Sequence, residues 1–174
     1  MPNLTYEIRK AHPDEHAALG QLMIESYSNL NGFITQEEQP EYYKMLRDIG
    51  LQADKPNTEL IIAITPDGQI CGGLVYFKDM AQYGSGGTAT AEKNASGFRL
   101  LAVGSQFQNQ GIAKQLTLAS IGKARQDGNE KMVIHTTKAM HVAWKMYEKL
   151  GFNRATDLDF QQGDMPVFGF RLFL

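Results

Sequence analysis

One loop of the sequence has residue types that suit the binding of a phosphate group. An apolar run over 98–103, Phe-Arg-Leu-Leu-Ala-Val, has the composition of a strand, and a polar turn separates it from a helical pattern starting at Ile112. Gly111 and Ala113 flank the first residue of that helix. The first N–H groups of a helix lack internal partners and carry the positive end of its dipole, so small residues there let an anion approach closely. The alternative is a glycine that only makes the strand-to-helix turn.

These residues resemble the acyl-CoA signature of the GNAT superfamily of N-acetyltransferases, in which Gln/Arg-x-x-Gly-x-Gly/Ala follows an apolar strand ending Leu-Ala-Val. The matching residues here are Leu-Ala-Val at 101–103, then Gln108, Gly111 and Ala113. A Tyr-Glu-Lys-Leu-Gly-Phe segment at 147–152 follows at a suitable distance. The C-terminal half of the chain matches closely, and the N-terminal half matches by the order of its elements.

The resemblance implies that acetyl-CoA is the cosubstrate. In the family, the strand ending Leu-Ala-Val diverges from the next parallel strand, and the pantetheine arm lies in the opening, bonded to that strand's backbone. The N–H groups of 110–114 would then hold the pyrophosphate. The residues expected to bind the cosubstrate are Leu101, Ala102, Val103, Gln108, Asn109, Gln110, Gly111, Ile112, Ala113, Lys114 and Met140.

Tyr147 corresponds to the family tyrosine that protonates the departing CoA thiolate. A phenol stays neutral at pH 7 because its unperturbed pKa is ~10, so it can donate this proton. The alternative is a tyrosine that only packs its ring on the sheet. Two positions depart from the family pattern: Met140 replaces a common asparagine, and Gly97 replaces a glutamate that serves some members as general base. The base stays open among Glu25, Glu92, His135 and ordered water.

Five residues are candidates for the acceptor site, chiefly Arg99, Tyr27 and Phe33. Arg99 places a charge within an apolar strand, which is costly unless the charge is paired, either with an acid such as Asp157 or Asp159 or with a carboxylate of the acceptor. In the family, the first two helices form one wall of the acceptor site. Tyr27 and Phe33 are therefore candidates, with ordinary core packing as the alternative, and the same holds for Tyr42 and Tyr43.

Length and composition favour one domain covering residues 1–174, with a formal net charge of −2 that creates no basic field for nucleic acid. The single cysteine, Cys71, forms no internal disulfide, and its strand-like surroundings indicate a buried core residue. The N-terminal residues do not resemble a signal peptide, and no apolar stretch approaches the ~20 residues of a membrane span. We therefore expect a cytoplasmic protein that binds neither membrane nor nucleic acid.

Periodicity and turn signals predict the order of the elements. The first strand covers 6–11 and a helix opens at Pro13; a second helix runs over about 35–49, capped by Thr35 and Glu38, with Pro40 able to delay its start. A hairpin, a mobile glycine-containing loop at 78–96, and alternating strands and helices follow: strands 58–64, 69–77, 98–103, 132–136 and 166–173, and helices 112–126 and 139–150. This order agrees with the GNAT fold, an α/β mixed sheet, mostly antiparallel, with a parallel pair at the cofactor cleft and flanking helices.

The sequence favours an N-acetyltransferase that moves an acetyl group from acetyl-CoA to a small-molecule or peptide amine by direct attack. A catalytically weak or inactive CoA-binding sensor or regulatory module is the alternative, because the glutamate and asparagine are absent. The His-x-x-Glu-His pattern at 12–16 is interpreted as a chance match to zinc peptidases, and no metal is expected. A homodimer through the aromatic final strand is left open.

Overall fold

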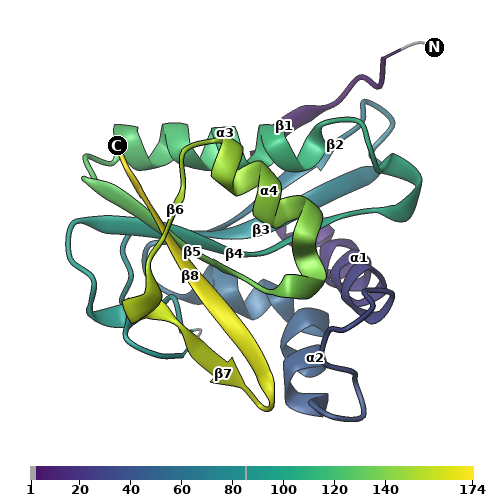
Figure 1. The fold of residues 1–174 in the computed structure, drawn as a ribbon. Coiled ribbons are helices and arrows are strands. Elements are labelled where there is room, and N and C mark those ends of the chain that lie inside the picture. The colour runs from purple at the N-terminus through teal and green to yellow at the C-terminus, as the bar shows by residue number, and fades with distance from the viewer. Residues whose placement is uncertain (1–2, 85) are drawn as a thin grey trace.

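The computed structural model describes residues 3–84 and 86–174, and within them eight strands form one sheet (Figure 1). The strand order is β1-β2-β3-β4-β5-β8-β6, with β7 paired to β8. The strands are β1 (Glu7–Lys10), β2 (Thr58–Ile64), β3 (Ile70–Phe77), β4 (Ala95–Val103), β5 (Lys131–Thr136), β6 (Asn153–Arg154), β7 (Phe160–Gln162) and β8 (Met165–Phe173).

Helices cover both faces of this sheet, because its interior strands alternate apolar side chains between two cores. One core contains residues of α1 (His16–Ser28) and α2 (Pro40–Arg47), and the other contains residues of α3 (Ile112–Gln126) and α4 (His141–Lys149). Along β2, for example, Leu60 and Ile62 belong to the first core and Ile61 to the second. In Figure 1, α4 crosses in front of the sheet, and α1 and α2 are grouped together at the lower right.

The predicted element order is confirmed, and most boundaries agree within two or three residues. The turn at 65–68 joins β2 to an antiparallel β3, and β4 and β5 are parallel, as expected for strands separated by a helix. The helix predicted over 112–126 has these bounds in the structure. Cys71 is fully buried, as predicted, and burial raises the pKa of its thiol.

The second helix differs from its prediction. Thr35 and Glu38 bond to each other as a capping pair would, but they close a turn, and the helix starts only at Pro40. Proline has no N–H to donate and restricts the residue before it, so it fits the first helical position and not the interior. Ile49–Asp54 forms a separate 3-10 segment instead of continuing α2.

The C-terminal strands also go beyond the prediction. The sequence predicts a single final strand over 166–173, but Phe160–Gln162 forms a further strand, β7, which pairs antiparallel with the start of β8. β6 pairs antiparallel with Phe170 and Arg171, further along the same edge of β8. Strands of the same chain therefore occupy much of the edge of β8 that a dimer would use.

The loop between β3 and β4 is held to the core by three buried side chains, so the expectation of an unpacked segment fails at these positions, whereas its mobility stays a prediction. Met80, Tyr83 and Ala89 are buried. Met80 and Tyr83 lie against Gly97, where an added Cβ would come within 2.9 Å of the Met80 sulfur and 2.6 Å of the carbonyl oxygen of Val133. The strand position where some family members carry a glutamate therefore has no space for a side chain.

The sheet opens between β4 and β5. These strands pair only over Ala95–Gly97, although β4 continues beside β3 to Val103 and β5 continues beside β8 to Thr136. A β-bulge lies in the same part of β4, where the register against β3 shifts and Leu100 adopts a φ of 63°. The bulge reverses the alternation of side chains, so that Phe98 belongs to the α3–α4 core and Leu100 to the α1–α2 core.

None of the helices in the described residues combines the length and the apolar character that a membrane span needs.

Candidate functional site

A cleft with a volume of about 350 Å³ passes through the sheet where β4 and β5 separate. Its walls include Tyr27 and Phe33 from the α1–α2 side and Ala143 and Tyr147 from the α3–α4 side. The cleft also reaches Ala113 in the first turn of α3. A ligand in this cleft would therefore contact both faces of the sheet and the N-terminal end of a helix.

The loop before α3 has a backbone suited to anion binding. Gly111 is the N-cap residue with a φ of 77°, and Asn109 has a φ of 62°. The N–H of Gln115 donates to the carbonyl of Gly111 (3.0 Å), so the N–H groups of 112–114 precede the first hydrogen bond of the helix. No atom lies within 4 Å of the Cβ position at Gly111, which leaves open space beside these donors.

The open edge of β4 presents polar backbone groups to the cleft. The Leu101 carbonyl accepts a hydrogen bond from the Tyr27 hydroxyl (2.8 Å), and the Val103 carbonyl accepts one from the Gln108 side-chain amide (2.9 Å). Side chains thus satisfy two carbonyls that a fully paired strand would bond to its neighbour. Tyr27 thereby helps to hold the bulged part of β4, and burial raises the pKa of its hydroxyl.

Tyr147 lies in the cleft wall with its ring held by aromatic neighbours. The ring centroid is 6.0 Å from that of Phe98 and 5.7 Å from that of Phe152, and the residue is 4% exposed. Among the described residues its hydroxyl forms no hydrogen bond, whereas the hydroxyls of Tyr27, Tyr43, Tyr76 and Tyr83 all do. Burial raises the pKa of Tyr147, so the phenol keeps its proton at neutral pH.

The structure brings many of the predicted site residues to one place. The cleft is lined by Leu101, Ala102, Val103, Gln108, Ala113, Met140, Tyr147, Arg99, Tyr27 and Phe33. Asn109, Gln110, Gly111 and Lys114 are exposed in the loop and first turn beside it. Ile112 is buried in the α3–α4 core, so only its backbone can face a ligand. Met140, at the N-cap position of α4, offers the cleft a thioether in place of an amide.

Arg99 does not form the ion pair that we considered for it. Its Nη1 donates to the Tyr83 carbonyl (3.0 Å), and its guanidinium lies 5.8 Å from the centre of the Tyr83 ring. Asp157 pairs instead with Arg171, and Asp159 with Arg154, each at 2.7 Å. Within the described residues, Arg99 therefore has no carboxylate partner.

Tyr83 and His135 form a polar pair in the cleft wall that sequence patterns did not reveal. The Tyr83 hydroxyl and His135 Nδ1 are 2.9 Å apart, and His135 Nε2 is 2.8 Å from the Leu158 carbonyl. A carbonyl only accepts, so Nε2 carries the proton and Nδ1 accepts from Tyr83. Burial lowers the pKa of His135 and outweighs the hydrogen bond to the Leu158 carbonyl, which raises it; the Arg99 charge also lowers it, so the neutral ring is favoured.

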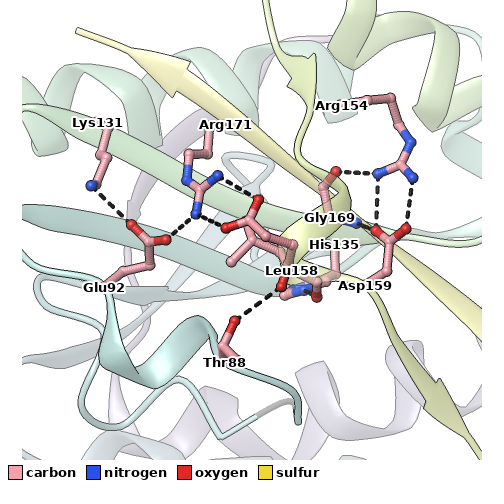
Figure 2. A network of polar contacts seen from close by, with 10 residues as sticks. Thr88, Glu92, Lys131, His135, Arg154, Leu158, Asp159, Gly169 and Arg171 are labelled. Atoms are coloured by element: carbon pink, nitrogen blue, oxygen red, sulfur yellow. Dashed lines mark hydrogen bonds and ion pairs between the residues drawn. The ribbon is translucent and has the colours of Figure 1, made fainter.

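A network of ion pairs holds the segment that supplies the Leu158 carbonyl (Figure 2). Arg171 bonds Glu92 and Asp157, and Lys131 completes the group at 2.9 Å from Glu92. On the other side of Leu158, Arg154 bonds Asp159 and the Gly169 carbonyl (2.6 Å). Burial alone would raise the pKa of Glu92, but its bonds to Arg171 and Lys131 outweigh this and lower it. These contacts hold the segment whose Leu158 carbonyl accepts from His135 Nε2, and that hydrogen bond sets the tautomer of the ring.

We expect His135 to titrate below its ordinary pKa of 6.5 and to carry its proton on Nε2 at neutral pH. Because the folded state favours the neutral ring, this contribution to stability is present above pH 6.5 and is lost as the pH falls through the lower folded value. Nitrogen–proton correlation spectra over a pH series measure both properties, and His135→Gln assigns the signal. A midpoint at or above 6.5, or an Nδ1–H tautomer, contradicts this arrangement.

The other candidates for a base lie elsewhere. Glu25 is exposed on α1 and accepts a hydrogen bond from Gln21, and Glu92 is engaged by Arg171 and Lys131. The structure therefore leaves His135 as the side chain among them that lines the cleft.

The His-x-x-Glu-His pattern does not come together as a site. His12, Asp14 and Glu15 place possible ligand atoms within 4.8 Å of one another, but His16 is not part of this group. Both oxygens of Glu15 accept hydrogen bonds from Arg9 at 2.8 Å, and the bond to Arg9 lowers the pKa of Glu15 to about 2. The carboxylate serves as a partner for Arg9 and as part of a capping box.

The comparisons with known proteins agree with this geometry. The model of the acetyltransferase (GNAT) family matches residues 18–152, and the chain belongs to this family. No curated protein matches the sequence at a significant level.

Solved structures share the fold at low sequence identity. A GNAT-family acetyltransferase from Staphylococcus aureus Mu50 is 17% identical with a TM-score of 0.72, covering 96% of this chain and 98% of its own. An N-acetyltransferase from Thermoplasma acidophilum in complex with coenzyme A is 15% identical with a TM-score of 0.69, covering 95% and 98%. The protein yncA from Salmonella typhimurium, with its cofactor acetyl-CoA, is 15% identical with a TM-score of 0.61, covering 97% and 94%.

Proposed function

We propose that this protein is an N-acetyltransferase that moves an acetyl group from acetyl-CoA to an amine by direct attack. The observation that carries the proposal is the cleft through the sheet between β4 and β5, which joins the N-terminal end of α3 to the Tyr147 hydroxyl, a group with no hydrogen-bond partner among the described residues. The coenzyme A and acetyl-CoA bound by the Thermoplasma and Salmonella proteins support acetyl-CoA as the donor.

The donor binds along β4 and at the start of α3. The N–H groups of 110–114 hold the pyrophosphate, because the positive φ of Gly111 and the space beside it let phosphate oxygens reach them. The exposed Lys114 adds a charge-assisted contact. The pantetheine arm lies against the open edge of β4 at Leu101–Val103, with Met140 beside it.

The chemistry needs one proton given and one taken. The amine nitrogen attacks the thioester carbon; the N–C bond forms, the C–S bond breaks, and Tyr147 gives its hydroxyl proton to the departing sulfur. The nitrogen releases its surplus proton to the Tyr83 hydroxyl, which passes its own proton to His135 Nδ1 over 2.9 Å. Tyr147 and His135 then exchange protons with solvent, so both return to their starting states.

Transfer through a covalent enzyme intermediate has little support. Cys71 is fully buried in the α3–α4 core, and its thiol has a pKa raised by burial. Such a thiol is a poor nucleophile.

Thermal unfolding with acetyl-CoA, CoA and ATP, followed by turnover with a panel of amines, tests the proposal. We expect selective stabilisation by acetyl-CoA and CoA, about 2.7 kcal/mol when the ligand is at a hundred times its dissociation constant. We also expect CoA release together with a product heavier by one acetyl group. Stabilisation without turnover would indicate a CoA-binding module, and no stabilisation would refute both readings.

A further inference from the structure

The charges of the cleft limit which amines can serve as acceptor. Among the described residues that line it there is no aspartate, glutamate or lysine, and Arg99 is the permanently charged side chain. The positive charge of Arg99 also acts on its neighbours. Burial raises the pKa of Tyr42 and Arg99 lowers it, whereas burial and Arg99 both lower the pKa of His135. An acceptor with only an ammonium group would meet a like charge here and no carboxylate.

Arg99 has donors to spare. A guanidinium carries five N–H donors in a planar fork, and one nitrogen of Arg99 bonds the Tyr83 carbonyl. The carboxylates of Asp157 and Asp159 already pair with Arg171 and Arg154. A half-buried cation without a counter-ion is costly, so an anionic ligand would relieve this cost.

Two further polar groups of the cleft have no protein partner. The hydroxyls of Thr136 and Thr137, which are 1% and 3% exposed, are buried without a hydrogen-bond partner in the described structure. Thr136 is the last residue of β5, Thr137 follows it, and both residues line the cleft. Each oxygen is almost completely covered by protein, however, so a ligand in the cleft would not reach it in this conformation, and Arg99 is the group that recognises charge.

The wall of the cleft on the α1–α2 side, here called the acceptor side, is largely aromatic. Tyr27, Phe33 and Tyr42 form a chain of ring contacts, with centroid distances of 5.1 and 5.7 Å, and Phe160 lies 5.1 Å from the ring of His135. The Tyr27 hydroxyl is engaged by the Leu101 carbonyl, so this wall offers mainly apolar surface. Such a wall suits an aliphatic or aromatic body.

We propose that the acceptor is a free α-amino acid with an apolar or aromatic side chain, and that Arg99 holds its carboxylate. This inference rests on the proposed acetyltransferase function. The bound carboxylate neutralises Arg99, the side chain packs on the aromatic wall, and the α-amino group attacks the thioester. The product is the N-acetyl amino acid with its carboxylate unchanged.

Matched acceptors test this inference directly. L-Phenylalanine is compared with L-phenylalaninamide and 2-phenylethylamine, and L-leucine with L-leucinamide and 3-methylbutylamine, at equal concentrations of the unprotonated amine. We expect kcat/KM for each acid to exceed that of its amide and decarboxylated amine by roughly ten- to a hundredfold, the range of a charge-assisted hydrogen bond. CoA release and the mass of the product measure turnover.

Variants of Arg99 separate recognition from structure. Arg99→Met should remove most of the preference for the acid by raising its KM, and Arg99→Lys should keep part of it because it retains the charge without the fork. Both should keep the stabilisation by acetyl-CoA. Lys138→Met removes an exposed cation next to the cleft and should leave the preference unchanged.

The outcomes keep this inference apart from the proposed function. Faster turnover of the amides or amines, an acid preference that survives in Arg99→Met, or turnover of other amines but of no panel acid would overturn the acceptor class and leave acetyl transfer standing. Failure of acetyl-CoA to stabilise the protein would remove the proposed function, and the acceptor class with it.

Discussion

Replacing Tyr147 with phenylalanine is expected to lower kcat by about 10²- to 10⁴-fold, the usual contribution of a positioned proton donor. The hydroxyl has no hydrogen-bond partner among the described residues, and the ring is held by Phe98 and Phe152, contacts that a phenyl ring retains. Stability and acetyl-CoA binding should therefore change little. Steady-state turnover and thermal unfolding with acetyl-CoA measure the two effects separately.

Tyr43→Phe is the matched control for this prediction. The buried Tyr43 hydroxyl donates to the Ile34 carbonyl at 2.8 Å and does not line the cleft. Its loss should cost about 0.5–1.5 kcal/mol of stability and leave kcat unchanged. If Tyr147→Phe kept kcat within threefold of wild type, another group would have to protonate the leaving thiolate.

Gly111→Glu is expected to abolish the stabilisation by acetyl-CoA. The new carboxylate would lie beside the first N–H groups of α3, where the negative pyrophosphate is proposed to bind, and would repel it. Its side chain has open space, so it need not disturb the core. The shift of the unfolding midpoint with increasing acetyl-CoA measures the loss.

The same helix supplies a control for backbone strain. Gly128 follows α3 at its other end, with a φ of 76° against 77° for Gly111, and it has the same open surroundings. Each glutamate should therefore lower the free energy of unfolding by a similar amount, roughly 1–2 kcal/mol, because a residue with a side chain is strained at a positive φ. Only Gly111→Glu should lose the response to acetyl-CoA; an equal response in both variants would place the pyrophosphate elsewhere.

The fold could be predicted where local patterns and chain order agree. The turn at 65–68 and the helix at 112–126 follow from proline, glycine and periodicity, and the parallel pairing of β4 and β5 follows from the helix between them. Boundaries failed where proline competed with periodicity, as at Pro40. β7 was missed because a strand of three residues shows too little alternation to be recognised.

The candidate site was only partly predictable. The loop around Gly111 has a local signature, so its residues could be named from the sequence. Tyr83 could not be named in this way, because it belongs to an irregular segment and reaches the cleft only through packing against Gly97. The pairing of His135 with Tyr83 and Leu158 joins residues 52 and 23 positions away, and no short-range pattern carries such information.

The bulge at Leu100 makes the number of residues in β4 as important as their identity. Two side chains in succession, Arg99 and Leu100, lie on the acceptor side because one residue is inserted relative to β3. Deleting that residue would restore regular pairing with β3. The side chains on one side of the deletion would then point to the opposite face of the sheet. Substitutions along β4 change single contacts, whereas a change of one residue in its length would reassign the whole wall of the cleft.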